Sequence, residues 1–147
     1  MSNESKKMIT TLKETWHKMD SLYDAYAKAS GLNFTGLIVY ELLYYSDEIH
    51  TQKGICEQLS LPKQLVNSII KSLWEQEHVK LVEAKDRRNK EIIVTSQGRK
   101  YISSILEPLE DAEMAAWEGF ADDEIANYAN IMTKYVSALE DILGKFK

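Results

Sequence analysis

The spacing of apolar residues changes within the stretch 63–95. From Leu65 to Trp74 the apolar residues recur at three- and four-residue steps, which predicts an amphipathic helix. Residues 79–95 instead hold runs of β-branched and aliphatic residues on both sides of a charged stretch, 85–91, which predicts a two-stranded hairpin with a polar tip. The sequence therefore predicts a mainly α-helical fold that contains one small β-hairpin.

The stretch before this helix is also predicted to be helical. Apolar residues repeat at helical spacing over residues 8–26, and Gly31 ends this segment. Thr35 and Thr51 are suited to cap a second and a third helix, because a threonine hydroxyl can accept from the free N–H groups of the first turn. Pro62 suits the first turn of the fourth helix, where its missing N–H costs nothing.

The C-terminal third is predicted to hold two further helices. One runs from Ser96 toward Trp117, and Pro108 is expected to kink or break it because proline removes a backbone hydrogen bond. The acidic run 122–124 suits the start of the last helix, whose apolar stripe extends over residues 125–146. The first and last helices carry more large apolar groups than so small a monomer can cover, so we expect a homodimer.

The middle of the chain has the outline of a winged helix-turn-helix, in which a helix enters the major groove of DNA and a hairpin contacts the backbone or the minor groove. We expect residues 35–95 to form a winged helix-turn-helix DNA-binding lobe. Residues 1–34 and 96–147 would form a helical dimerisation region. The predicted fold class is therefore mainly α with a small β-hairpin wing.

Basic residues are concentrated in the middle third, although the net charge of the chain is −5. Residues 51–100 hold ten Lys and Arg against six Asp and Glu, whereas residues 101–147 hold three against ten. A basic island between acidic flanks favours a nucleic-acid face there and would help to select which face approaches DNA.

The polar face of the predicted fourth helix lacks acidic residues before Glu75, and five of its six side chains could donate hydrogen bonds to bases or phosphates at once. An ordinary solvated helix face is the simpler interpretation of many such patterns, but such a face usually includes acidic residues. The residues on this face are Lys63, Gln64, Asn67, Ser68, Lys71 and Ser72.

Other function classes find little support. No nucleophile elbow, phosphate-binding loop or zinc-protease motif is present, so we expect that the protein is not an enzyme. The three histidines lack the spacing of metal ligands, so we expect no metal and no cofactor. No apolar run reaches about 18 residues and the N-terminus has no signal-peptide pattern, so we expect a cytoplasmic protein with no membrane span. The single cysteine, Cys56, is interpreted as a small buried apolar residue rather than a redox sensor.

The run from Asp86 to Gly98, DRRNKEIIVTSQG, resembles the wing signature of the MarR family of winged-helix regulators. That signature has an Asp-x-Arg tip, a hydrophobic return strand and a Leu-Thr-x-x-Gly opening of the next helix. Residues 51–70 look like the helix-turn-helix of the family, and the acids 122–124 are similar to its pattern before the last helix. The resemblance covers nearly the whole chain.

The resemblance implies a bacterial homodimer that binds a pseudo-palindromic, double-stranded DNA operator and represses transcription until a small molecule or another signal releases it. It implies that Arg88 enters the minor groove at the wing tip, where Asp86 holds it through a charge-assisted bond. The residues expected to contact DNA are Lys63, Gln64, Asn67, Ser68, Lys71, Arg87, Arg88 and Lys90.

The sequence departs from the family pattern at the start of the wing. Glu77 stands where a glycine is usual between the recognition helix and the first wing strand, and Leu81 stands where an arginine is frequent. These departures concern the angle and the backbone contacts of the wing.

An effector pocket is a further expectation from the family, whose ligand sites for small aromatic compounds lie between the dimer helices and the DNA lobe. The residues that could line one here are Trp16, His17, Tyr40 and Tyr44. Core or dimer-interface packing is the simpler interpretation of each. A winged-helix protein-interaction module without DNA binding remains the alternative function, although the wing tip and the outer face of the fourth helix are basic or neutral.

Overall fold

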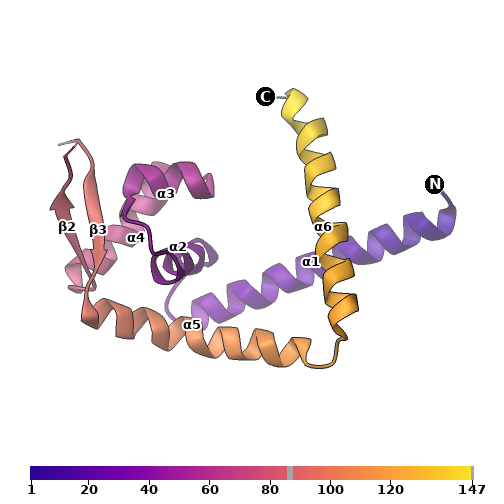
Figure 1. Ribbon diagram of the computed structural model, residues 1–147, viewed down its shortest axis with the longest axis horizontal. Helices are drawn as coiled ribbons and strands as arrows, with labels where there is room; N and C mark the ends of the chain where they lie inside the picture. Colours follow the sequence, from indigo (N-terminus) through magenta and orange to yellow (C-terminus); the bar gives the residue numbers. More distant parts are fainter. Residues whose placement is uncertain (86–87, 147) are drawn as a thin grey trace. The chain divides into compact units, whose positions relative to one another are not determined.

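The computed structural model describes residues 1–85 and 88–146. Its elements, in chain order, are α1 (Asn3–Ala29), α2 (Phe34–Tyr45), β1 (His50–Thr51), α3 (Gln52–Leu59), α4 (Lys63–Glu75), β2 (Val79–Glu83), β3 (Lys90–Val94), α5 (Ser96–Trp117), α6 (Asp122–Leu143) and the 3-10 turn η1 (Gly144–Phe146) (Figure 1). The predicted fold class is confirmed, because the chain is mainly α-helical and carries a small β-hairpin beside a helix-turn-helix.

The sheet has one strand more than the sequence predicted. Strands β2 and β3 form the expected antiparallel hairpin, with Leu81 opposite Ile92. The short β1 pairs antiparallel with the other edge of β3, placing His50 opposite Ile92, so that the described strands have the order β1–β3–β2. A two-residue strand shows no periodicity, which is why the sequence did not reveal it.

The observed helix caps correct one prediction and support another. Asn33, and not Thr35, caps α2, because its side-chain oxygen accepts from the Gly36 N–H at 2.7 Å. Thr51 caps α3 as predicted, accepting from the Gly54 N–H at 3.0 Å. Pro62 lies one residue before α4, at the N-cap position.

The chain forms two compact units, Met1–Glu107 and Pro108–Lys147. The boundary falls at Pro108, the residue where the sequence predicted a kink or break. No break occurs, because α5 continues through this proline. Within the first unit, the hydroxyl of Tyr26 near the end of α1 donates to the backbone carbonyl of Ile105 in α5 at 2.7 Å.

The core of the first unit is built from one face of each helix around the sheet. Of the predicted apolar stripe on α4, Val66, Ile70 and Leu73 are fully buried, whereas Leu65 and Trp74 are exposed. The buried apolar residues in this lobe include Leu37, Val39, Tyr40, Leu43, Ile55, Val79 and Ile92. Since α4 contacts α2, α3 and β2, this core fixes α4 and the base of the β2–β3 hairpin.

The turn between α4 and β2 has a left-handed backbone at Glu77, with φ of +58°. This is the position where the family pattern has glycine, and the conformation explains that preference, because a Cβ crowds the backbone in this region. The strained glutamate is tied into the fold, since its carbonyl accepts from the Thr95 hydroxyl at 2.8 Å.

Replacing Glu77 with glycine is expected to increase the free energy of unfolding by about 1 kcal/mol, because the left-handed strain disappears and the backbone carbonyl is retained. Urea denaturation measures the change. Glu75→Gly is the matched control, since Glu75 lies in helical backbone and its replacement should lower stability by about 1 kcal/mol. Destabilisation by both variants would contradict the prediction.

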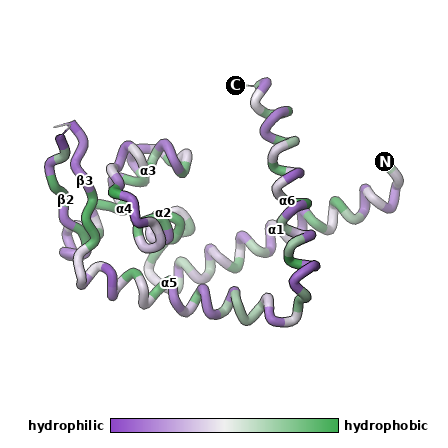
Figure 2. Tube along the Cα trace, viewed as in Figure 1, coloured by the Kyte–Doolittle hydropathy of each residue, from purple (hydrophilic) through white to green (hydrophobic). Residues whose placement is uncertain are grey.

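The helices at the two ends of the chain expose apolar side chains. Hydrophobic and hydrophilic residues alternate along both α1 and α6 (Figure 2). None of the residues of α6, all of which are described, is buried. Exposed residues of these helices are Met8, Ile9, Leu12, Met19 and Leu22 in α1, and Tyr128, Ile131, Tyr135, Val136, Leu139, Ile142 and Leu143 in α6. Among residues 1–85 and 88–146, no helix is both long and apolar enough to cross a membrane.

Candidate nucleic-acid interface

Helices α3 and α4 form a helix-turn-helix with a short, ordered turn. Ser60 closes α3 with a left-handed backbone, φ +53°, and its N–H donates to the carbonyl of Cys56. The N–H of Leu61 donates to the same carbonyl at 3.1 Å. The two helices pack against each other, so the turn sets the direction in which the first turn of α4 projects.

The polar face of α4 lies in solvent. All five side chains that the sequence assigned to DNA contact on this helix are exposed: Lys63, Gln64, Asn67, Ser68 and Lys71. Lys71 forms an exposed ion pair with Glu75, with 3.8 Å between Nζ and the carboxylate, so this lysine is partly neutralised in the free protein. Water screens such a pair strongly, so it would exchange readily for a phosphate.

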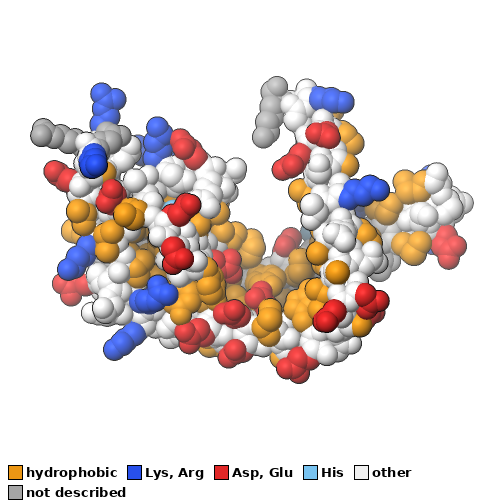
Figure 3. Space-filling model, viewed as in Figure 1, with side chains coloured by type: hydrophobic (Ala, Val, Ile, Leu, Met, Phe, Trp, Pro, Cys, Tyr) orange, Lys and Arg blue, Asp and Glu red, His pale blue; other side chains and the backbone are white. Residues whose placement is uncertain are grey.

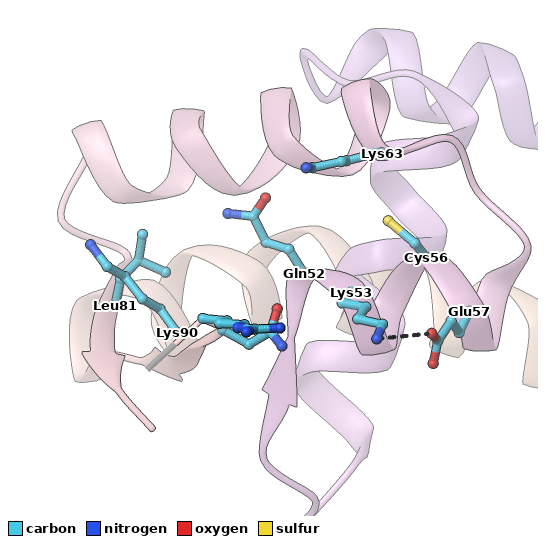
Figure 4. Close-up of a pocket in the computed structure, with 9 residues that line it drawn as sticks. Gln52, Lys53, Cys56, Glu57, Lys63, Leu81 and Lys90 are labelled. Carbon is cyan, nitrogen blue, oxygen red and sulfur yellow. Dashed lines mark ion pairs between the residues drawn. The ribbon is translucent and has the colours of Figure 1, made fainter. Parts of the chain in front are cut away.

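A cavity of about 580 Å³ separates the helix-turn-helix from the wing (Figure 4). Among the residues that the structure describes, its polar lining comes from three elements and the wing tip and contains four basic side chains and one acidic side chain. The lining residues are Gln52, Lys53, Cys56, Glu57, Lys63, Leu81, Arg88, Asn89 and Lys90. Lys63 points into this space from the start of α4, and Gln52 points into it from the start of α3 (Figure 4).

The cavity brings together residues that lie far apart in the sequence. Of the predicted contact residues, Lys63, Arg88 and Lys90 meet here, while the exposed side chains of Gln64 and Ser68 lie outside its lining. The predicted residues Asp86 and Arg87 lie outside the residues that the structure describes. Lys and Arg side chains gather around the tip of the β2–β3 hairpin, whereas acidic side chains gather along the later part of α5 (Figure 3).

Sequence reasoning missed the contribution of α3. Gln52 and Lys53 begin this helix and line the cavity opposite the wing. Lys53 also lies 3.9 Å from Glu57, a long and exposed ion pair, and the described lining residues together carry a net positive charge. The predicted cap at Thr51 was the available signal, because the residues that follow the cap of the first helix in a helix-turn-helix lie beside the DNA backbone.

Cys56 is half-buried and lines this cavity, so it is more accessible than the buried residue that the sequence predicted. Its place on the inner side of α3 accounts for the difference, because the cavity leaves one side of the helix without a packing neighbour. Within the described part of the chain, no group of three or more His, Cys, Asp or Glu side chains could hold a metal ion.

Two of the four predicted effector-pocket residues, Tyr40 and Tyr44, lie on α2. Tyr40 is buried beside Tyr101, with ring centroids 6.1 Å apart, and burial raises its pKa, helped by the hydrogen bond to Tyr101. The hydroxyl of Tyr44 hydrogen-bonds Glu107 at 2.8 Å, and this bond raises its pKa. The guanidinium of Arg99 lies 4.7 Å from the Tyr44 ring centroid.

The other two members of that predicted group lie on α1. Trp16 is half-buried, and His17 is exposed. Tyr40 and Tyr44 thus join α2 to α5 inside the first unit. Their role in effector binding remains a prediction.

Comparison with solved structures shows closely similar folds. One is NMB1585, a MarR family regulator from Neisseria meningitidis, with a TM-score of 0.76 and 23% identity, covering 95% of this chain and 99% of that one. Another is the MarR family transcription regulator SP03579, with a TM-score of 0.80 and 12% identity, covering 97% and 94% of the two chains. A third is Staphylococcus aureus MepR in complex with DNA, with a TM-score of 0.70 and 18% identity, covering 88% and 96%.

No family model and no curated protein matches the sequence. The similarity to the three solved structures extends over nearly the whole length of both chains in each case. This similarity concerns the fold. The chain therefore has the fold of the MarR family of winged-helix regulators.

Proposed function

We propose that this protein is a sequence-specific, DNA-binding transcriptional regulator that acts as a homodimer on a pseudo-palindromic operator. The observation that carries the proposal is the cavity between α3, α4 and the wing, whose lining, within residues 1–85 and 88–146, holds four basic side chains and one acidic side chain. Such a concentration of cations in an otherwise acidic chain is suited to bind phosphates, because each neutralised phosphate releases counterions.

Base recognition is proposed for the exposed first turns of α4. Gln64 and Asn67 carry amides that can pair with an adenine through two hydrogen bonds, and Ser68 can donate to or accept from any base. The cavity cations would hold the backbone while α4 lies in the major groove. In protein–DNA complexes, phosphate contacts position the protein and base contacts select the sequence.

The exposed apolar residues of α1 and α6 support the homodimer. Covering these apolar faces with a second copy would stabilise the dimer by about 25 cal/mol for each Å² of apolar surface removed from water. A two-fold dimer would place two α4 helices about 34–36 Å apart, one turn of DNA. We further propose that the dimer represses transcription. A small aromatic molecule or another signal would release it from DNA by altering this spacing.

A binding assay tests the proposed function. The full chain is titrated against labelled duplex DNA taken from just upstream of its own gene, at 50 and 200 mM salt, with an unrelated duplex as the control. A dimer that neutralises six or more phosphates should lose about 10³-fold or more in affinity between these concentrations. Absence of binding at the lower salt concentration would favour the alternative, a winged-helix protein-interaction module without DNA binding.

Asn67→Ala is expected to change sequence preference more than salt dependence. Removing a paired amide contact should reduce discrimination at one base pair of each half-site by about tenfold, because such a contact is worth about 1–3 kcal/mol. Affinities for the operator and for its single-base variants measure this. Ser72→Ala, an exposed change later on the same helix, is the control. A uniform loss over all sequences would instead assign Asn67 to positioning.

A further inference from the structure

Leu65 is an apolar side chain exposed within the polar surface of α4. It is the third residue of the helix and is 41% exposed, whereas Val66 and Ile70 are fully buried. Its neighbours Gln64 and Ser68 are exposed polar residues. A leucine in this place cannot make a hydrogen bond, so it can distinguish bases only through an apolar contact.

The helix geometry places Leu65 on the flank of α4 that faces away from the wing. Successive residues of an α-helix are turned by about 100°, so Gln64 lies nearly opposite the buried direction marked by Val66 and Ile70. Lys63 lies on the flank beside the wing, since it lines the cavity together with Leu81. Leu65 occupies the opposite flank, and in a major groove it would face the other groove wall.

We propose that Leu65 recognises the 5-methyl group of a thymine in each operator half-site. This inference rests on the proposed DNA-binding function and adds a specificity-determining residue to it. Thymine is the base that presents an apolar group in the major groove, so a leucine at the groove wall favours thymine over cytosine, adenine and guanine. The first turn of a recognition helix is the part that reaches the base edges, and Leu65 belongs to this turn.

The test combines site selection with removal of single methyl groups. The full chain selects its preferred duplex from a random library, and each thymine of the selected site is then replaced by deoxyuridine, which lacks only the methyl group. Affinities are measured for the wild type, for Leu65→Ala and for Leu65→Met. Ser72→Ala, a change at an exposed residue of the same helix that is not assigned to DNA contact, is the matched control.

Replacing one thymine of a half-site with deoxyuridine is expected to lower the affinity of the protein for the duplex about fourfold. This factor corresponds to burying one carbon group. Leu65→Ala should abolish this sensitivity, whereas Leu65→Met and Ser72→Ala should keep it. Three outcomes overturn the inference and leave the proposed function in place. They are equal sensitivity to methyl removal in the wild type and Leu65→Ala, no sensitive thymine at any position, and a selected site without thymine. Failure of the wild type to select any sequence overturns both.

Discussion

Gly98→Ala should lower the free energy of unfolding by about 3 kcal/mol, a loss typical of severe overpacking. A Cβ at Gly98 would lie 1.8 Å from the carbonyl oxygen of His78, a backbone atom that cannot rotate away. The same carbonyl accepts from the Thr95 N–H at 3.0 Å. Any shift that relieves the clash would therefore pull the start of α5 away from the end of α4.

The clash introduced by Gly98→Ala should also weaken the neighbouring contacts between α5 and the turn before β2. The Thr95 hydroxyl accepts from the Gly98 N–H at 3.0 Å and donates to the carbonyl of Glu77, so it links α5 to the turn before the wing. The His78 ring stacks on Tyr101, with centroids 4.3 Å apart. Moving the His78 backbone would disturb both contacts.

Urea denaturation followed by circular dichroism measures the effect of Gly98→Ala. Gly119→Ala is the matched control, because Gly119 has an ordinary backbone conformation and no atom lies within 4 Å of its added Cβ. The control should stay within about 0.5 kcal/mol of the wild type. Comparable stability of the two variants would show that the junction can relax, and that the Thr-x-x-Gly pattern is not required by packing.

This junction also shows how far the sequence could predict the fold. The Thr-x-x-Gly pattern was recognised as part of a family signature, and the structure gives the physical reason for it: a helix cap and a close backbone approach. The glutamate at position 77 was recognised as a departure, but its left-handed conformation could not be predicted, because glutamate has no preference for it.

The errors in the fold prediction come from non-local or competing interactions. Strand β1 forms only because it pairs with β3, some forty residues later in the chain. A local sequence pattern therefore cannot predict it. Asn33 and Thr35 are both suitable caps, and the amide of Asn33 reaches the Gly36 N–H. Periodicity on α4 assigned Leu65 to the core, whereas the packing of α3 and β2 leaves it exposed.

The candidate site was predictable residue by residue but not as a cavity. Charge and position selected Lys63, Arg88 and Lys90 from the sequence, and these three side chains do line one space. Lys53 was missed because its proximity to the wing depends on the packing of α3 against β3, a tertiary contact. Composition indicates which residues can bind phosphate, but only packing brings them to the same place.

Substitution of cavity cations should have the largest effect on DNA binding. Arg88→Ala is expected to weaken operator binding by about tenfold or more at physiological salt, and the double variant Lys63→Ala/Arg88→Ala by a further factor of similar size. Each lost phosphate contact should reduce the slope of log K against log[salt] by about 0.9, hence by about 1.8 for two symmetric contacts in a dimer. Fluorescence anisotropy over a salt series measures both quantities.

Lys28→Ala is the matched control, because Lys28 is an exposed cation on α1 that lies outside the cavity and pairs with Asp24 at 2.7 Å. Its removal should leave affinity and salt slope unchanged. Unchanged operator affinity for Arg88→Ala, with folding confirmed by circular dichroism, would refute the assignment of the wing to DNA.

Arg88→Lys separates two ways in which the wing could act. If Arg88 contacts only phosphates, lysine should preserve most of the affinity, because the charge is kept. If Arg88 lies in the minor groove, lysine should weaken binding most at operators with A·T-rich flanks, where the narrow groove has the most negative potential and favours arginine. The dependence of the Arg88→Lys effect on flank sequence therefore reports which groove surface the wing tip contacts, a distinction that the loss of charge in Arg88→Ala cannot make.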